Sequence, residues 1–119
     1  MGYIRHEAII ITSWDAKAVA FAVINAEALG LTTIGPSKPT VNGYVTATIV
    51  PDGSKEGWDD SDIGDQLRAK FREWLRLQRH SDGGSSLEWV QIAYGSDDGK
   101  AVITDDEWST PPAPRLEKE

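Results

Sequence analysis

Residues 63–78 carry apolar side chains at the spacing of an amphipathic helix, and this pattern constrains the fold more than any other in the chain. Five of the six residues on one stripe are apolar; the stripe consists of Ile63, Leu67, Phe71, Trp74, Leu75 and Gln78. We expect Ser61 or Asp62 to cap the start of this helix. Because such a helix must bury its apolar stripe against another layer, the pattern predicts a layered domain.

Segments rich in β-forming residues surround this helix, together with a second helical segment. Strands are expected over residues 4–12, 31–34, 44–50, 87–94 and 100–104. Residues 16–29 are expected to form a helix capped by Asp15. The resulting order predicts an α+β two-layer sandwich of the ferredoxin-like βαββαβ kind, with an extra C-terminal hairpin strand. We expect one domain over residues 1–104 and an acidic, proline-rich tail over residues 105–119.

Overall composition narrows the classes of function. The chain has 119 residues and no cysteine, which excludes disulfides, thiolate zinc sites and thiol nucleophiles. Its net charge of −7 makes it a poor general binder of nucleic acid or of anionic membranes. No apolar stretch approaches the roughly 20 residues of a membrane span, and Arg5, His6 and Glu7 precede only a short apolar run. We therefore expect a cytoplasmic protein.

Catalytic and metal-binding patterns are weak. The chain has two histidines, His6 and His80, and neither belongs to a phosphoesterase motif; no Gly-x-Ser-x-Gly segment is present. Residues 52–63 imitate a calcium loop, but Ile63 stands where the bidentate glutamate is expected. We therefore expect no enzyme activity, no metal and no cofactor, with a hydrolase as a remote alternative.

The loop before the helix at residues 63–78 is the principal candidate for ligand binding. It offers the hydroxyl of Ser54, the ammonium group of Lys55 and the ring of Trp58 beside a helix N-terminus. This set suits a phosphorylated ring, with Lys55 on the phosphate and Trp58 stacked on the base. An acidic surface loop with Trp58 folded onto the core is the plainer alternative.

Arg5 and His6 are further candidates for ligand binding, although they point to opposite faces of the first strand. The ferredoxin-like order is expected to place them at the sheet end opposite the 54–58 loop, so that a shared site needs two subunits. A hydrogen-bonded core residue is the plainer interpretation of His6.

Four residues are candidates for an interface. Trp89 is expected on the open face of the sheet, opposite Val90 and Ile92, as a contact for a second copy or a partner. Simple packing within the protein is the alternative for Trp89. Trp108 is a candidate to clamp onto a groove or a neighbouring subunit. Arg72 and Arg76 belong to a stripe of arginines expected opposite the apolar stripe, either as a solvated surface or as a contact for an anion or an acidic protein.

Four segments together carry a family resemblance: Gly2–Trp14, Val41–Tyr44, Asp52–Ser61 and Glu88–Gly95. Over most of residues 2–99 the chain resembles small, uncharacterised proteins encoded by bacteriophages of actinobacteria. The resemblance implies a phage accessory protein that acts inside a bacterium, and it supplies no catalytic residue.

Together these observations predict a non-enzymatic phage protein that binds and sequesters a small phosphate-bearing host molecule, such as a nucleotide immune signal, and so counters host defence. Oligomerisation through the open sheet face is expected to bring loops from two copies together. The alternative is an inhibitor that binds a host protein through the exposed sheet face or the acidic surface.

Overall fold

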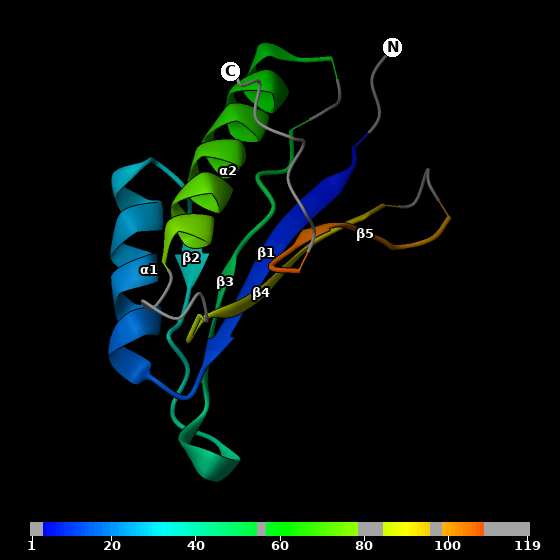
Figure 1. Cartoon of the computed structure of the whole chain (residues 1–119). Coiled ribbons are helices and arrows are strands. Elements are labelled where there is room, and N and C mark those ends of the chain that lie inside the picture. Colours follow the sequence, from blue (N-terminus) through cyan, green and yellow to red (C-terminus); the bar gives the residue numbers. More distant parts are fainter. Residues whose placement is uncertain (1–3, 55–56, 79–84, 96–98, 109–119) are drawn as a thin grey trace, which may run out of the picture.

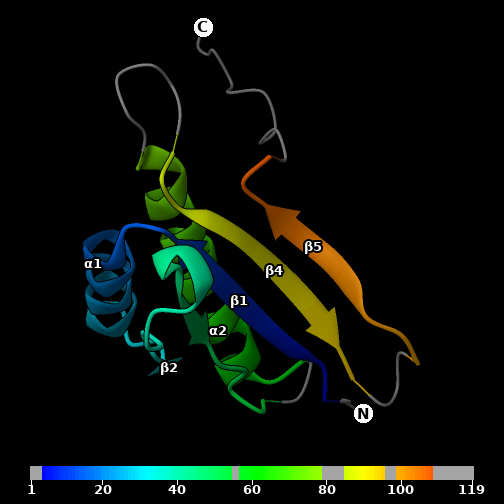
Figure 2. The ribbon, with the colours of Figure 1, turned by 90° about the horizontal axis from the view of Figure 1, so that it is seen from below.

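The computed structural model describes residues 4–54, 57–78, 85–95 and 99–108. In chain order the elements are β1 (His6–Ser13), α1 (Ala16–Ala28), β2 (Thr33–Ile34), the 3-10 turn η1 (Val41–Gly43), β3 (Val45–Ile49), α2 (Asp59–Leu77), β4 (Glu88–Tyr94) and β5 (Val102–Asp106). The strands form one antiparallel sheet in the order β2-β3-β1-β4-β5. Both helices lie on the same face of this sheet (Figures 1 and 2). The expected α+β architecture of two layers is therefore confirmed.

The core lies between the helices and the sheet. Alternate residues of β1, such as Ile9 and Ile11, point toward the helices and are fully buried. They pack with Phe71 and Leu75 of α2 and with apolar residues of α1 and β3. Asp15 caps α1 as expected, because its carboxylate accepts hydrogen bonds from the backbone N–H groups of residues 17 and 18.

Strand β4 alternates as expected, but the expected assignment of its faces is wrong. Trp89 is only 3% exposed and belongs to the core. The reason is the register, which places Trp89 directly opposite Ile11, a residue that faces the helices. Residues opposite one another in an antiparallel pair share a face of the sheet. Val90 and Ile92 therefore lie on the open face instead.

Helix α2 begins earlier than expected. Its first residue is Asp59, and Trp58 occupies the N-cap position, where its side chain makes no capping hydrogen bond. Ser61, one of the expected caps, lies inside the first turn and is buried. The acidic residues of this turn, Asp59, Asp60 and Asp62, take over the electrostatic role of a cap because they face the positive end of the helix dipole.

The arginines of α2 also differ from the expectation of a solvated stripe. Arg68 is 5% exposed, and Arg72 and Arg76 are partly buried against the sheet. Arg68 precedes Phe71 by three residues and so lies only about 60° from it around the helix axis. The arginines therefore flank the apolar stripe rather than oppose it, and they reach carboxylates on the sheet. Arg79 lies outside the described residues.

Strand β5 extends past the expected end of the domain at residue 104. Asp105 and Asp106 pair through their backbones with Gln91 and Val90 of β4. The carboxylate of Asp105 accepts from Arg76 at 2.5 Å and lies 2.9 Å from Nε of Arg72. An expected tail residue is thus the anchor that holds an edge strand to a helix.

Candidate functional site

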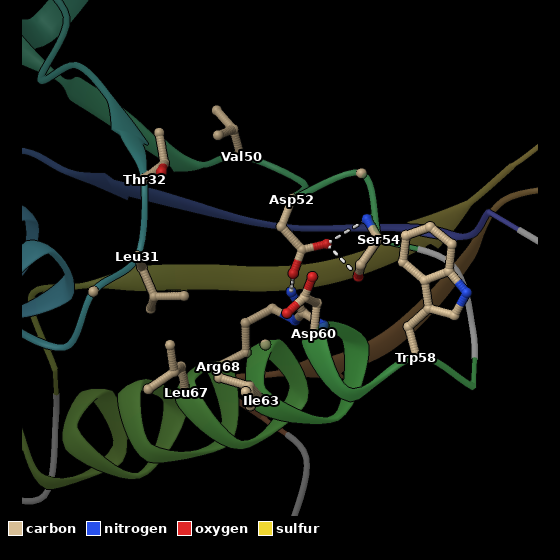
Figure 3. Close-up of a pocket in the computed structure, with 13 residues that line it drawn as sticks. Leu31, Thr32, Val50, Asp52, Ser54, Trp58, Asp60, Ile63, Leu67 and Arg68 are labelled. Carbon is tan, nitrogen blue, oxygen red and sulfur yellow. Dashed lines mark hydrogen bonds and ion pairs between the residues drawn. The ribbon is translucent and has the colours of Figure 1, made fainter.

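The principal cavity lies where three segments meet, at the N-terminal end of α2 (Figure 3). Its walls come from residues 30–32 after α1, residues 50–54 after β3 and residues 58–68 in the first turns of α2. The volume is about 380 Å³. Pockets for small molecules commonly measure about 300–1,000 Å³, so this cavity is large enough for one compact ligand.

The cavity has an apolar end and a polar end. Leu31, Val50 and Leu67 line the first, and the carboxylates of Asp52 and Asp60 line the second (Figure 3). The ring of Trp58, which is 51% exposed, stands beyond the polar end. A half-exposed indole beside a cavity offers an apolar face on which a planar ligand can stack.

Arg68 organises the polar end. Its Nη2 donates to Asp65 at 2.5 Å, its Nε lies 3.3 Å from Glu7, and its Nη1 lies 3.5 Å from Asp52. The Arg68 side chain is 6% exposed, so its charge is well shielded from water. A buried charge is stable only where it is paired, and here three carboxylates from β1, α2 and the loop after β3 supply the pairing.

The carboxylate of Asp52 is held in place on both sides. One oxygen accepts from the backbone N–H of Ser54 at 2.9 Å and from its hydroxyl at 2.7 Å. Partial burial raises the pKa of Asp52, but these two hydrogen bonds and the nearby charge of Arg68 outweigh it, so that the pKa lies below its ordinary value. A side chain at Gly64 would overlap the other oxygen of Asp52, so glycine at this helical position permits the close approach.

The charge of the lining opposes a phosphate group inside the cavity. Asp52 and Asp60 contribute two negative charges, whereas Arg68 contributes one positive charge that is already paired. The N-terminus of α2 faces its own three acidic residues. Helix dipoles attract anions, but here that attraction is largely satisfied within the chain. The lining instead favours groups that donate hydrogen bonds.

The structure brings together two of the residues predicted to bind ligand. Ser54 and Trp58 line the cavity, while Lys55 lies outside the described residues. His6 lies on the open face, where its ring packs against that of Tyr94 with 5.2 Å between centroids. His6 does not line the cavity. It is not a core residue either, which was the plainer interpretation of this histidine.

The expectation that Arg5 lies at the opposite sheet end is wrong. Strands β1 and β3 are antiparallel, so the end of β3 lies beside the start of β1. Arg5 approaches Glu7 at 4.0 Å, and Glu7 contacts Arg68 of the cavity wall. Arg5 therefore lies at the outer margin of the cluster around Arg68. Arg5 and the cavity belong to one chain, so no second subunit is needed to bring them together.

The predicted interface residues have different environments. Arg72 and Arg76 contact Asp105 of the same chain, and Arg76 also lies over the ring of Trp89, 5.1 Å from its centroid. These arginines therefore contact a carboxylate of their own chain, whereas the predicted contact with an anion or an acidic partner stays a prediction. Trp108 is 75% exposed and borders a shallow groove on the open face, beside Ile10.

Sequence reasoning missed part of the polar end of the cavity. Asp60 was considered only within a calcium-loop pattern and Arg68 only within the arginine stripe, while Gly64 and Glu7, which contacts Arg68, were not considered for a site. The available signal was a glycine inside a strongly helical segment, followed four residues later by an arginine. Such a glycine often marks the close approach of another group.

Comparisons of the chain with protein-family models, with curated proteins and with solved structures gave no match.

Within the described ranges, no three histidine, aspartate or glutamate side chains are grouped so that they could hold a metal ion. Neither α1 nor α2, the two α-helices of the described part, has the length and apolar character that crossing a membrane requires.

Proposed function

We propose that the protein is a non-enzymatic binder that sequesters a small host molecule of the nucleotide type in the cavity at the N-terminus of α2. In an infected bacterium, the setting implied by the sequence resemblance, such binding would remove a host immune signal. The action would be cytoplasmic.

One observation carries this proposal: a cavity of about 380 Å³ with one apolar end has an exposed tryptophan and hydrogen-bond acceptors at its other end. Planar bases combine an apolar face with polar edges, and they bind where an aromatic ring and a few fixed polar groups converge. Ser54, the hydroxyl of the lining nearest to this end, donates to Asp52 and has no histidine beside it in the described lining. The arrangement therefore suits binding better than nucleophilic catalysis.

The charges of the lining also orient the ligand. With Asp52 and Asp60 at the polar end, a base fits inside, and a phosphate is better placed outside the cavity. The loop that contains Lys55 follows Ser54 directly, so an ammonium group is available from the same segment of sequence. The phosphate-binding role of Lys55 is part of this proposal.

Native mass spectrometry of the full chain with a panel of nucleosides and nucleotides tests the proposal. We expect a mass shift of one ligand per cavity, with the ligand released unchanged on denaturation. Trp58→Ala should abolish the shift without lowering the melting temperature. Trp14→Ala is the matched control, because Trp14 is also more than half exposed but does not line the cavity. Absence of any adduct at millimolar ligand, or a converted ligand, would refute the proposal.

The open face of the sheet supports a second candidate, a surface that binds a host protein or a second copy. Ile103 of β5 is 66% exposed there, and Trp108, which is 75% exposed, borders a groove with Ile10 and Val90. Exposed apolar residues that lie together mark interaction surfaces. Light scattering of the purified chain and of Ile103→Asp distinguishes a second copy from a host protein as the occupant of this face. A homo-oligomer would dissociate in the variant, whereas a monomer would be unaffected.

The finer assignment of the fold belongs to the same proposal. We infer a ferredoxin-like variant, because the elements from β1 to β4 follow the order βαββαβ and neighbour one another as β2-β3-β1-β4. Strand β5 adds a fifth member beside β4 and distinguishes this sheet from a four-stranded one.

A further inference from the structure

We propose that the cavity selects guanine over adenine, with the carboxylate of Asp60 as the residue that determines specificity. This inference rests on the proposed function and names the class of ligand for the same site: a guanine base, as a nucleoside or as part of a nucleotide. It follows from the state of the two carboxylates at the polar end.

The two carboxylates are not equivalent. Asp52 is engaged on both sides, by Ser54 and by Arg68. Asp60 makes no hydrogen bond or ion pair to another described residue, and its side chain points to the same side of α2 as Asp52 and Ser54 (Figure 3). Among the described side chains of the lining, Asp60 therefore offers carboxylate oxygens that are not engaged and remain available to a ligand.

A carboxylate without a partner in the protein binds best to a base that presents hydrogen-bond donors. It accepts hydrogen bonds and cannot donate them, and its two oxygens suit two parallel N–H donors. The Watson–Crick edge of guanine presents such a pair, from its ring N–H and its exocyclic amino group. Adenine presents an amino group beside a ring nitrogen that carries a lone pair, and that lone pair would face the carboxylate. Hypoxanthine retains the ring N–H and lacks the amino group.

The groups around Asp60 also favour a base that donates hydrogen bonds. Trp58 lies two residues before Asp60, so a base held by the carboxylate comes within reach of the exposed indole face. The apolar end of the cavity, formed by Leu31 and Leu67, offers no donors from its side chains to satisfy the lone pair of adenine. Asp60 is exposed in the free protein, and a bound base would cover its carboxylate from water. A covered carboxylate discriminates against an analogue that lacks the N–H group, because its oxygens would then be left unpaired.

Titration calorimetry of the full chain with guanosine, inosine and adenosine tests the inference, since nucleosides separate recognition of the base from recognition of phosphate. We expect affinity to fall in that order, with guanosine about 10- to 100-fold tighter than adenosine, the discrimination typical of a bidentate contact to a base. Asp60→Asn should weaken guanosine binding by about tenfold or more and remove most of the preference over adenosine. Asp62→Asn is the matched control, because Asp62 lies in the same turn but does not line the cavity.

The outcomes separate this inference from the proposed function. Equal affinities for guanosine and adenosine, or a preference that survives Asp60→Asn, would overturn the assignment of Asp60 while leaving a ligand-binding cavity. If none of the three nucleosides binds the unaltered protein, both the assignment of Asp60 and the proposed function are overturned. Competition by inorganic phosphate alone would show that an anion site, rather than a base site, occupies the cavity.

Discussion

Replacing Arg68 by methionine tests whether the buried ion cluster holds the cavity together. Methionine fills much of the same volume and removes the charge, which leaves Glu7, Asp52 and Asp65 without their shared partner. Removing one partner of a fully buried ion pair costs about 3–5 kcal/mol, because the other charge is left uncompensated. That figure must be reduced here according to the exposure of each carboxylate.

The three carboxylates differ in exposure. The side chains of Asp52 and Asp65 are 42% and 51% exposed, so water can solvate them again and each loss is about 0–1 kcal/mol. The side chain of Glu7 is 17% exposed and, among the described residues, would retain Arg5 and Gln91 as polar neighbours. We therefore expect Arg68→Met to lower the free energy of unfolding by about 2–4 kcal/mol. At about 4 °C per kcal/mol, the melting temperature should fall by roughly 8–16 °C.

Urea denaturation and calorimetry measure this loss against two controls. Lys70→Met removes an exposed cation from the same helix and should change stability by no more than about 0.5 kcal/mol. Glu7→Gln should recover part of the stability when added to Arg68→Met, because it removes the charge that had lost its partner. A loss no larger than that of Lys70→Met, or strict additivity of the Glu7 and Arg68 variants, would refute the reasoning.

Three further outcomes follow from the same contacts. Because the pKa of Asp52 is lowered in the folded state, its stabilising contribution is present above about pH 4 and is lost as the pH falls through the folded pKa; thermal melts of Asp52→Asn should lose less stability on acidification than the unaltered protein. Asp105→Asn should destabilise by about 1–3 kcal/mol and raise hydrogen exchange in β5 more than in β1, and equal exchange in the two strands would contradict its anchoring role. Trp89→Ala should cost about 3–5 kcal/mol in chemical denaturation, whereas Trp108→Ala should leave stability nearly unchanged; similar losses would contradict their assigned environments.

The elements and their layering could be predicted from sequence because local signals agree there. The apolar spacing of residues 63–78 and the cap at Asp15 depend on near neighbours in the chain. Both helices form over the expected segments, although α2 begins earlier than expected, at Asp59. Which face of a strand is covered depends instead on pairing with distant strands. Trp89 was assigned to the wrong face because its position is determined by its register with Ile11, which alternation alone does not reveal.

The candidate site was predicted in part for the same reason. Ser54 and Trp58 were found because a loop beside a helix start has a local signature. The cluster around Arg68 was not found, since it joins residues from β1, the loop after β3 and α2 that are far apart in the sequence. A helical wheel shows an arginine near an apolar stripe. It does not show that the carboxylates of Glu7 and Asp52 lie within reach of that arginine.

The most direct test of the ligand-binding cavity is an NMR titration of the full chain with guanosine, observing the five tryptophan indole N–H signals. The proposed function predicts a saturable shift of the Trp58 signal, with little change at Trp89 in the core or at Trp108 on the open face. Shifts confined to Trp108 would move binding to the open face of the sheet. No shift of Trp58 at saturating guanosine would contradict the account.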